Sequence, residues 1–308
     1  AAVGADKRVI VQSGGSVMLG TVTAGSGATT IPGEQIGVTG QSVDITSAVA
    51  TNGALSIDAT NGIARIANGA AQRGSANMSA NGPVEVTGEL SGSGLVRVIA
   101  TGPAGSVTAN RLISSANGIT VAGNTGASVT FADANTSLGI ASAQGNVVLG
   151  TGKAGTTATL STLPGTGMVQ VTQDLTSGQS ATVNSGGNAE LAKVTATTGN
   201  VTINALNGSV SGIGGARANL TATAGAVDVK AGPSALLGPV FSGGDFKVEA
   251  NTVDVSSANV GGDLSLDTKA GNATLTTGTV TGASLVKASG DATIGTLNSV
   301  GAATLTAG

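Results

Sequence analysis

The strongest constraint on this chain is a short recurring unit: glycine, any residue, an apolar residue, a polar residue and a second apolar residue. Glycine tolerates the backbone angles of a tight corner. The apolar–polar–apolar triplet has the two-residue period of a strand with one buried face, so the unit predicts short strands that alternate with corners. Its clearest copies are Gly-Asn-Val-Thr-Ile from Gly199, Gly-Ala-Val-Asp-Val from Gly225, Gly-Asn-Ala-Thr-Leu from Gly271, Gly-Asp-Ala-Thr-Ile from Gly290 and Gly-Ala-Ala-Thr-Leu from Gly301.

One register of corners can be followed along the whole chain at an average step of about 20 residues, a length found among solenoid repeats. Its anchors are Gly15, Gly40, Gly62, Gly82, Gly105, Gly126, Gly145, Gly167, Gly187, Gly208, Gly225, Gly244, Gly262, Gly282 and Gly301. A second set begins strands about half a repeat away. Its members include Gly53, Gly94, Gly118, Gly199, Gly271 and Gly290. Each repeat is therefore expected to hold at least two short strands and two corners.

Strands at this period, with no helical stretch, predict an all-β fold. The expected architecture is a right-handed, single-stranded parallel β-helix, a solenoid of about 15 coils of roughly 20 residues. Leucine-rich repeats have a similar length, but their Leu-x-x-Leu-x-Leu frame is missing. We expect residues 1–308 to form a single continuous shaft, with irregular loops near 20–37 and 233–243, where the pattern is least regular.

The composition narrows the possible functions. The chain has 51 glycines, and it has no cysteine, histidine, tryptophan or tyrosine. The most common catalytic bases, nucleophiles and soft metal ligands are therefore missing. Lysine and arginine are scattered singly and the only aromatic residues are Phe131, Phe241 and Phe246, which argues against nucleic-acid binding. We expect no enzymatic activity, no cofactor and no insertion into a membrane.

One candidate metal site comes from a repeated Gly-Gly-Asp, at residues 243–245 and 261–263. This spacing would stack Asp245 beside Asp263, and two aligned carboxylates are possible ligands for calcium. The competing interpretation is that both aspartates are turn formers next to glycine. We favour it because asparagine occupies similar places at Asn146, Asn188, Asn200 and Asn272.

The register also predicts which outward side chains share a face. Asp44, Arg65 and Glu85 should stack as acid, base and acid, and Asp228 should lie beside Lys247. Outward threonines could form the flat surface of an ice-binding solenoid. This row consists of Thr202, Thr274, Thr293 and Thr304, and it is interrupted by Glu190, Asp228 and Lys247.

Coils of this length, written as Gly-x-Val-x-Val strands among Gly, Ala, Thr and Asn, resemble the repeats of filamentous haemagglutinins. The resemblance covers nearly the whole chain and is clearest from Gly187 to Gly308. Autotransporter passenger domains share much of the pattern. The resemblance implies two-partner secretion through an outer-membrane pore and a place in the medium or on the cell surface of a Gram-negative bacterium. It also implies a role in adhesion, biofilm or fibre formation.

Together these features predict a structural and adhesive shaft that is part of a large exoprotein, with a host or bacterial surface receptor or matrix as its unidentified partner. The alternatives are a carbohydrate-active β-helix enzyme and an ice-binding β-solenoid. Because the pattern stops in mid-coil at Gly308 without a capping helix, we also expect either a longer native chain or end-to-end self-association.

Overall fold

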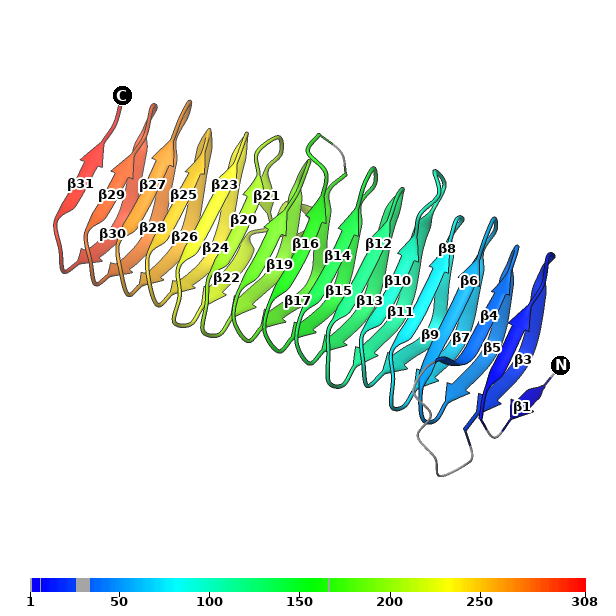
Figure 1. Ribbon diagram of the computed structural model, residues 1–308. Coiled ribbons are helices and arrows are strands. Elements are labelled where there is room, and N and C mark those ends of the chain that lie inside the picture. The colour runs from blue at the N-terminus through cyan, green and yellow to red at the C-terminus, as the bar shows by residue number, and fades with distance from the viewer. Residues whose placement is uncertain (1, 6, 26–33, 166) are drawn as a thin grey trace. The chain divides into compact units, whose positions relative to one another are not determined.

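A computed structural model describes residues 2–5, 7–25, 34–165 and 167–308 of the chain. The chain divides into two compact units, residues 1–154 (unit 1) and 155–308 (unit 2). Both units consist of parallel β-strands stacked side by side (Figure 1). The only helix among the described residues is the short 3-10 turn η1 (Ile213–Gly215). The described residues thus contain no helix that is long and apolar enough to cross a membrane. The all-β, parallel β-helix prediction is confirmed.

In unit 1 the chain alternates between a sheet of long strands and a sheet of short strands. The long-strand sheet has the order β1 (Val3–Ala5), β3 (Val17–Ala24), β5 (Val43–Ala50), β7 (Ala64–Ala71), β9 (Val84–Gly92), β11 (Ser106–Ser114), β13 (Gly126–Ala134) and β15 (Val147–Ala154). The short-strand sheet has the order β2 (Val9–Gln12), β4 (Glu34–Gly40), β6 (Ala54–Ala59), β8 (Ala76–Ala80), β10 (Val96–Ala100), β12 (Ile119–Gly123) and β14 (Leu138–Ser142).

Unit 2 repeats this plan. Its long-strand sheet contains β17 (Val169–Ser177), β19 (Ala189–Ala196), β21 (Val210–Ser211), β22 (Ala218–Ala222), β24 (Ser234–Ser242), β26 (Thr252–Val260), β28 (Ala273–Val280) and β30 (Ala292–Ser299). Its short-strand sheet contains β16 (Ala158–Thr162), β18 (Ala181–Asn184), β20 (Val201–Ala205), β23 (Val227–Ala231), β25 (Phe246–Ala250), β27 (Leu264–Thr268), β29 (Ser284–Lys287) and β31 (Ala303–Thr306).

Each coil places the same kind of residue at the same point, because a strand pairs with its equivalents one coil before and one coil after. Val43 pairs with Ala64, and Ala64 pairs with Val84, so these coils are 21 and 20 residues long. All three side chains are fully buried. Burying an aliphatic side chain of valine size contributes about 1.5–3 kcal/mol. Columns of this kind form the core, and Val43, Ile45, Val84 and Val86 all point into it.

The long strands bend in the middle, because two consecutive residues face outward there. In β26 the inward residues are Val253 and Val255 before the bend and Ala258 and Val260 after it, while both Ser256 and Ser257 are only partly covered. Side chains normally alternate between the two faces of a strand, so this pair marks a break in direction. Each long strand therefore presents two outward surfaces, one before and one after the bend.

Unit 2 contains one enlarged coil that the repeat pattern did not predict. Val210 of β21 pairs with Ala235, 25 residues further on, and the turn η1 lies between β21 and β22. Strand β19 pairs with both β21 and β22, so the two short strands together replace one long strand. The extra residues close their own turn, in which the N–H of Gly212 donates to the carbonyl of Ala216 (2.8 Å).

This insertion overturns the single glycine register. From Gly15 to Gly208 the anchors precede strands of the long-strand sheets, for example Gly208 before Val210. From Gly225 onward they precede strands of the short-strand sheet, beginning with Val227 of β23. The second set of glycines changes from the short-strand sheet to the long-strand sheet: Gly199 precedes β20, and Gly271 precedes β28. Both sets begin strands, but neither follows one sheet through the chain.

The prediction of a loop near residues 233–243 is wrong, since Ser234–Ser242 forms β24 and pairs with β26 over its whole length. Gly238 and Pro239 form a bulge within this strand, at which β24 has one residue more than its neighbour β22. Of the other predicted loop, near 20–37, residues 26–33 lie outside the described residues. Its edges are strands, because β3 continues to Ala24 and β4 begins at Glu34.

The three phenylalanines provide a test of this core. Phe246 is fully buried in β25, whereas Phe241 is 41% exposed in β24. We expect Phe246→Ala to lower the free energy of unfolding by about 3–5 kcal/mol, because it leaves a cavity inside the coil stack. Phe241→Ala, the same change on the surface, should cost less than about 1 kcal/mol. Far-UV circular dichroism during denaturation measures both, and equal losses would contradict the assigned register.

Candidate functional site

The candidate calcium ligands Asp245 and Asp263 lie at successive corners before β25 and β27 and act as caps for the backbone. Asp263 donates its backbone N–H to Oδ1 of Asp245 (2.9 Å), and Ala283 donates its N–H to Oδ1 of Asp263 (2.7 Å). Neither carboxylate has a third acidic partner, since no group of three or more His, Cys, Asp or Glu residues occurs in the part of the chain that the structure describes. This geometry favours the interpretation of both aspartates as turn formers.

Asparagines make the same bond at other corners. Oδ1 of Asn200 accepts the N–H of Ala226 (2.9 Å), and Oδ1 of Asn272 accepts the N–H of Asp291 (2.9 Å). The cap requires a glycine on the following coil. A Cβ atom at Gly262 would collide with Oδ1 of Asp245, and one at Gly282 would collide with Oδ1 of Asp263. The corner glycines thus make room for the caps of the preceding coil.

The predicted charge ladder is confirmed. Asp44 pairs in register with Arg65, and Arg65 pairs with Glu85. The guanidinium of Arg65 lies 3.7 Å from Oδ2 of Asp44 and 2.7 Å from Oε2 of Glu85. The hydrogen bond to Glu85 is the main cause that raises the pKa of Arg65. These groups are exposed to water, so their principal role is to favour this register over others.

The second predicted pair is confirmed in register but not in bonding. Asp228 pairs with Lys247, yet Nζ of Lys247 lies 2.6 Å from Oε1 of Glu249, two residues along the same strand. Glu249 also lies 3.7 Å from Lys269. The hydrogen bond from Lys247 is the largest cause that lowers the pKa of Glu249, and it correspondingly raises the pKa of Lys247.

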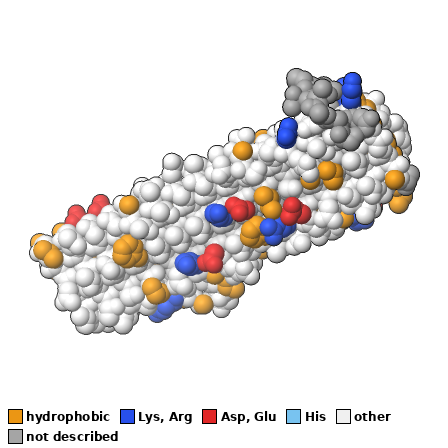
Figure 2. All heavy atoms as spheres, turned by 90° about the horizontal axis from the view of Figure 1, so that it is seen from below, with side chains coloured by type: hydrophobic (Ala, Val, Ile, Leu, Met, Phe, Trp, Pro, Cys, Tyr) orange, Lys and Arg blue, Asp and Glu red, His pale blue; other side chains and the backbone are white. Residues whose placement is uncertain are grey.

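Sequence reasoning missed four further ladders, in each of which an acid on one coil faces a base at the same position on the next. They are Glu89–Arg111 (3.0 Å), Asp133–Lys153 (3.9 Å), Asp174–Lys193 (3.9 Å) and Asp267–Lys287 (4.0 Å). The signal that could have found them is the separation of the acid from the base by one coil length. Figure 2 shows Lys and Arg beside Asp or Glu in small groups on an otherwise mostly uncharged polar surface.

One ion pair spans two coils instead of one. Arg217, which follows η1, forms a bidentate pair with Asp254: Nη1–Oδ1 is 2.9 Å and Nη2–Oδ2 is 2.7 Å. Nη1 also donates to the carbonyl of Leu237 on the intervening coil (3.1 Å). The hydrogen bond to Asp254 raises the pKa of Arg217. This contact fastens the enlarged coil to the regular coils that follow it.

The outward threonines do not form the regular plane that an ice-binding surface needs. Thr274 pairs with Thr293, but the coil before them has Asp254 at this position. Thr202 belongs to the other sheet, where it pairs with Asp228. The predicted Thr row therefore separates into short pieces that lie on different surfaces.

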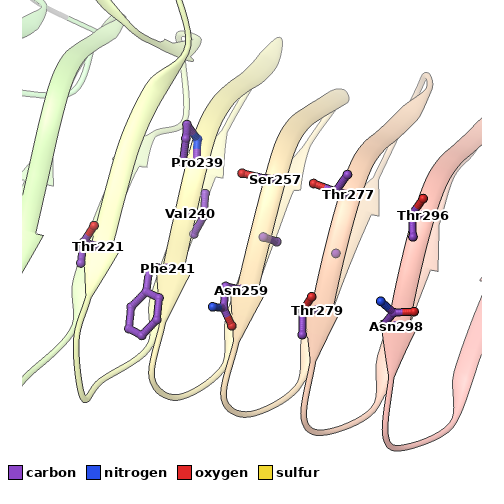
Figure 3. Close-up of a pocket in the computed structure, with 12 residues that line it drawn as sticks. Thr221, Pro239, Val240, Phe241, Ser257, Asn259, Thr277, Thr279, Thr296 and Asn298 are labelled. Carbon is purple, nitrogen blue, oxygen red and sulfur yellow. The ribbon is translucent and has the colours of Figure 1, made fainter.

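A different surface of unit 2 carries an uncharged polar groove of about 540 Å³. It lies on the long-strand sheet, after the bend, and crosses strands β22, β24, β26, β28 and β30 (Figure 3). Two rows of outward side chains form it. The first row is Pro239, Ser257, Thr277 and Thr296, and the second is Thr221, Phe241, Asn259, Thr279 and Asn298.

The groove is hollow over β26 and β28 because the residues between its two rows point inward there and are small. Ala258 and Gly278 lie between the rows in β26 and β28. A Cβ atom at Gly278 would collide with Leu297, whose side chain fills the interior beneath it together with Leu275. The core volume that glycine lacks is thus supplied by a leucine from the next coil, and the surface above stays concave.

Three polar side chains of the groove differ from those at the corners in having no hydrogen-bond partner among the described residues, whereas Thr277 donates to the carbonyl of Ser256 (3.4 Å). The side chains of Asn259, Thr279 and Asn298 make no hydrogen bond to any residue that the structure describes, whereas Asn200 and Asn272 cap the backbone. Their donors and acceptors point to solvent in the same row as the ring of Phe241, which is 41% exposed. No acidic or basic residue lines the groove, so it lacks the pair of carboxylates that glycoside hydrolysis requires.

Comparison of the chain with models of protein families, with curated proteins and with solved structures finds no match.

The corner aspartates can be tested by replacing Asp263. We expect Asp263→Ala to lower the free energy of unfolding by about 0.5–1.5 kcal/mol, because the N–H of Ala283 loses its acceptor. Asp263→Asn keeps that acceptor and should unfold like the wild type. Thermal unfolding with calcium and with a chelator checks the alternative role. A calcium-dependent rise of the midpoint in the wild type that Asp263→Asn abolishes would establish a calcium site.

The lowered pKa of Glu249 predicts a dependence of stability on pH. A carboxyl whose pKa is lower in the folded state stabilises the fold above its ordinary value of 4.5. This contribution disappears as the pH falls through the folded value. We therefore expect the wild type to be more stable than Glu249→Gln at pH 7, and the difference to shrink as the pH falls below 4.5. Denaturation midpoints across this range measure it. A difference that neither acid nor high salt reduces would exclude the ion pair as its cause.

Proposed function

We propose that this chain is a structural and adhesive shaft segment of a large bacterial exoprotein, secreted or displayed on the surface of a Gram-negative cell. The observation that carries the proposal is the groove on unit 2, where the polar side chains of Asn259, Thr279 and Asn298, which bond to no described residue, follow a single exposed aromatic ring, Phe241, over successive coils. A repeated surface of this kind suits binding that is spread along an extended partner. The likeness of the repeats to filamentous haemagglutinins supports it and adds an outer-membrane secretion pore as a partner in export.

The construction of the coils supports a shaft in a second way. Inward columns and backbone pairing hold each coil to its two neighbours, and outward side chains contribute little to this framework. In solenoids of this kind stability is close to a sum of terms for each repeat and each interface between neighbours. A shaft built on this principle should tolerate a change in its number of coils, whereas a catalytic site assembled from several coils should not.

Removal of one whole coil from unit 1 tests the shaft role. Val107 pairs with Ala127 and Val84 pairs with Val107, so deletion of residues 107–126 brings Val84 opposite Ala127 and keeps the inward column apolar. We expect the shortened protein to retain its strand signal in far-UV circular dichroism. Latex beads coated with it should adhere as well as wild-type beads to surfaces bearing polysaccharide or extracellular matrix.

The same assay separates adhesion from catalysis. Failure of wild-type beads to adhere to any of these surfaces would refute the adhesive role. Release of reducing ends from the polysaccharides by the wild type, abolished by the deletion, would instead support a carbohydrate-active enzyme. Beads coated with an unrelated β-rich protein of similar net charge provide the control for nonspecific attachment.

A further inference from the structure

The two rows of the groove have a regular spacing that few ligands match. Adjacent strands of a sheet lie about 4.8 Å apart, so the row from Phe241 to Asn298 offers one side chain per strand over about 14 Å. A pyranose ring has a length close to this strand separation. A linear polysaccharide that runs across the strands can therefore bring successive rings over successive strands.

The chemistry of the groove suits such a ligand. The ring of Phe241 is 41% exposed and offers an apolar face, against which the C–H face of a sugar ring can pack. Asn259, Thr279 and Asn298 follow it in the same row (Figure 3). An amide both donates and accepts hydrogen bonds, and so does a hydroxyl group, which matches the hydroxyl groups of a sugar. As these side chains bond to no described residue, binding would break no contact within the protein.

The absence of charge in the groove lining restricts the ligand further. The corresponding rows of unit 1 contain the pairs Glu89–Arg111 and Asp133–Lys153, whereas no acidic or basic residue lines the groove of unit 2. An anionic polymer would lose its hydration here without meeting a cation. The lining therefore favours a neutral chain.

We propose that this groove binds a neutral linear polysaccharide, with the chain lying across β24 to β30 and one sugar ring stacked on Phe241. The proposal rests on the adhesive role described above and gives it a ligand class. The bulge at Gly238–Pro239 lies at one end of the first row, where a Cβ atom at Gly238 would collide with Oδ1 of Asn219 on the previous coil.

Affinity electrophoresis through gels that contain a soluble polysaccharide tests this. The neutral probes are galactomannan, mixed-linkage β-glucan and arabinoxylan, and the charged probes are polygalacturonate and dextran sulfate. We expect the wild type to be retarded by at least one neutral probe, equally at low and high salt. Phe241→Ala should weaken this binding by about tenfold or more, the loss typical of an aromatic anchor.

Two further variants separate the groove from the rest of the chain. Thr279→Arg should also abolish retardation, since a long charged side chain would fill the middle of the groove. Phe131→Ala is the matched control: Phe131 lies in unit 1 with the guanidinium of Arg111 4.7 Å from its ring centre, so its removal should leave binding unchanged. Circular dichroism confirms that each variant is folded.

The outcomes distinguish this proposal from the adhesive role on which it rests. Retardation by the charged probes alone, or retardation that Phe241→Ala leaves intact, would overturn the groove as a site for neutral glycans. If beads adhere to matrix but no neutral probe retards the wild type, the groove proposal would also be overturned. The adhesive role would then stand. Loss of both bead adhesion and retardation in the wild type would overturn the two proposals together.

Discussion

Parallel pairing between equivalent strands of successive coils is the constraint on which the rest of this structure depends. It places residues about one coil length apart in direct contact, so that the side chains at each inward position form a column. Together these side chains must fill the interior space of the column without overlapping. Gly69 shows the consequence in unit 1. A Cβ atom there would collide with Leu90, the residue at the same position one coil later. Gly278 and Leu297 repeat this exchange in unit 2. Small and large residues alternate because the interior has room for only one of them.

The same pairing organises the outer surface, where the constraint is electrostatic instead of steric. Like charges stacked at strand separation repel each other, and the chain places acids opposite bases, as in Asp44–Arg65–Glu85. At the corners, the carboxylates and amides of Asp263 and Asn272 are used to cap the backbone of the next coil. The groove of unit 2 is the exception, because Asn259, Thr279 and Asn298 neither pair with a charge nor cap the backbone of a described residue. This difference is the basis for assigning binding to the groove and structural roles to the ladders and corners.

The enlarged coil shows how the solenoid accommodates irregularity. The additional residues around η1 leave the stack at the bend of a long strand, and β21 and β22 keep the pairing that a single long strand would have made. Arg217 then reaches across one coil to Asp254 and holds the displaced segment against regular coils. The first strand of the groove, β22, directly follows this segment. The irregular coil and the bulge at Gly238 therefore determine where the groove begins.

Local pattern in the sequence was sufficient for the strands, the corners and the register of the first coils. The alternation in Val43, Asp44 and Ile45 predicts which residues are buried, and a constant coil length brings Arg65 between Asp44 and Glu85. The calcium candidate and the turn role of Asp245 and Asp263 could also be stated from spacing alone. These features depend on neighbours within a strand or on one regular coil.

Only the tertiary structure decided which sheet each later strand joins and where the groove lies. Glycine begins strands of both sheets, so the sequence could not show that the coil after Gly208 is longer and that the two glycine sets change places there. The irregular pattern of residues 233–243 predicts a loop, because a local pattern cannot distinguish a bulge in a paired strand from a break in it. Phe241, Asn259 and Asn298 come from three coils of unequal length. They form one row only through strand pairing, which local sequence does not encode.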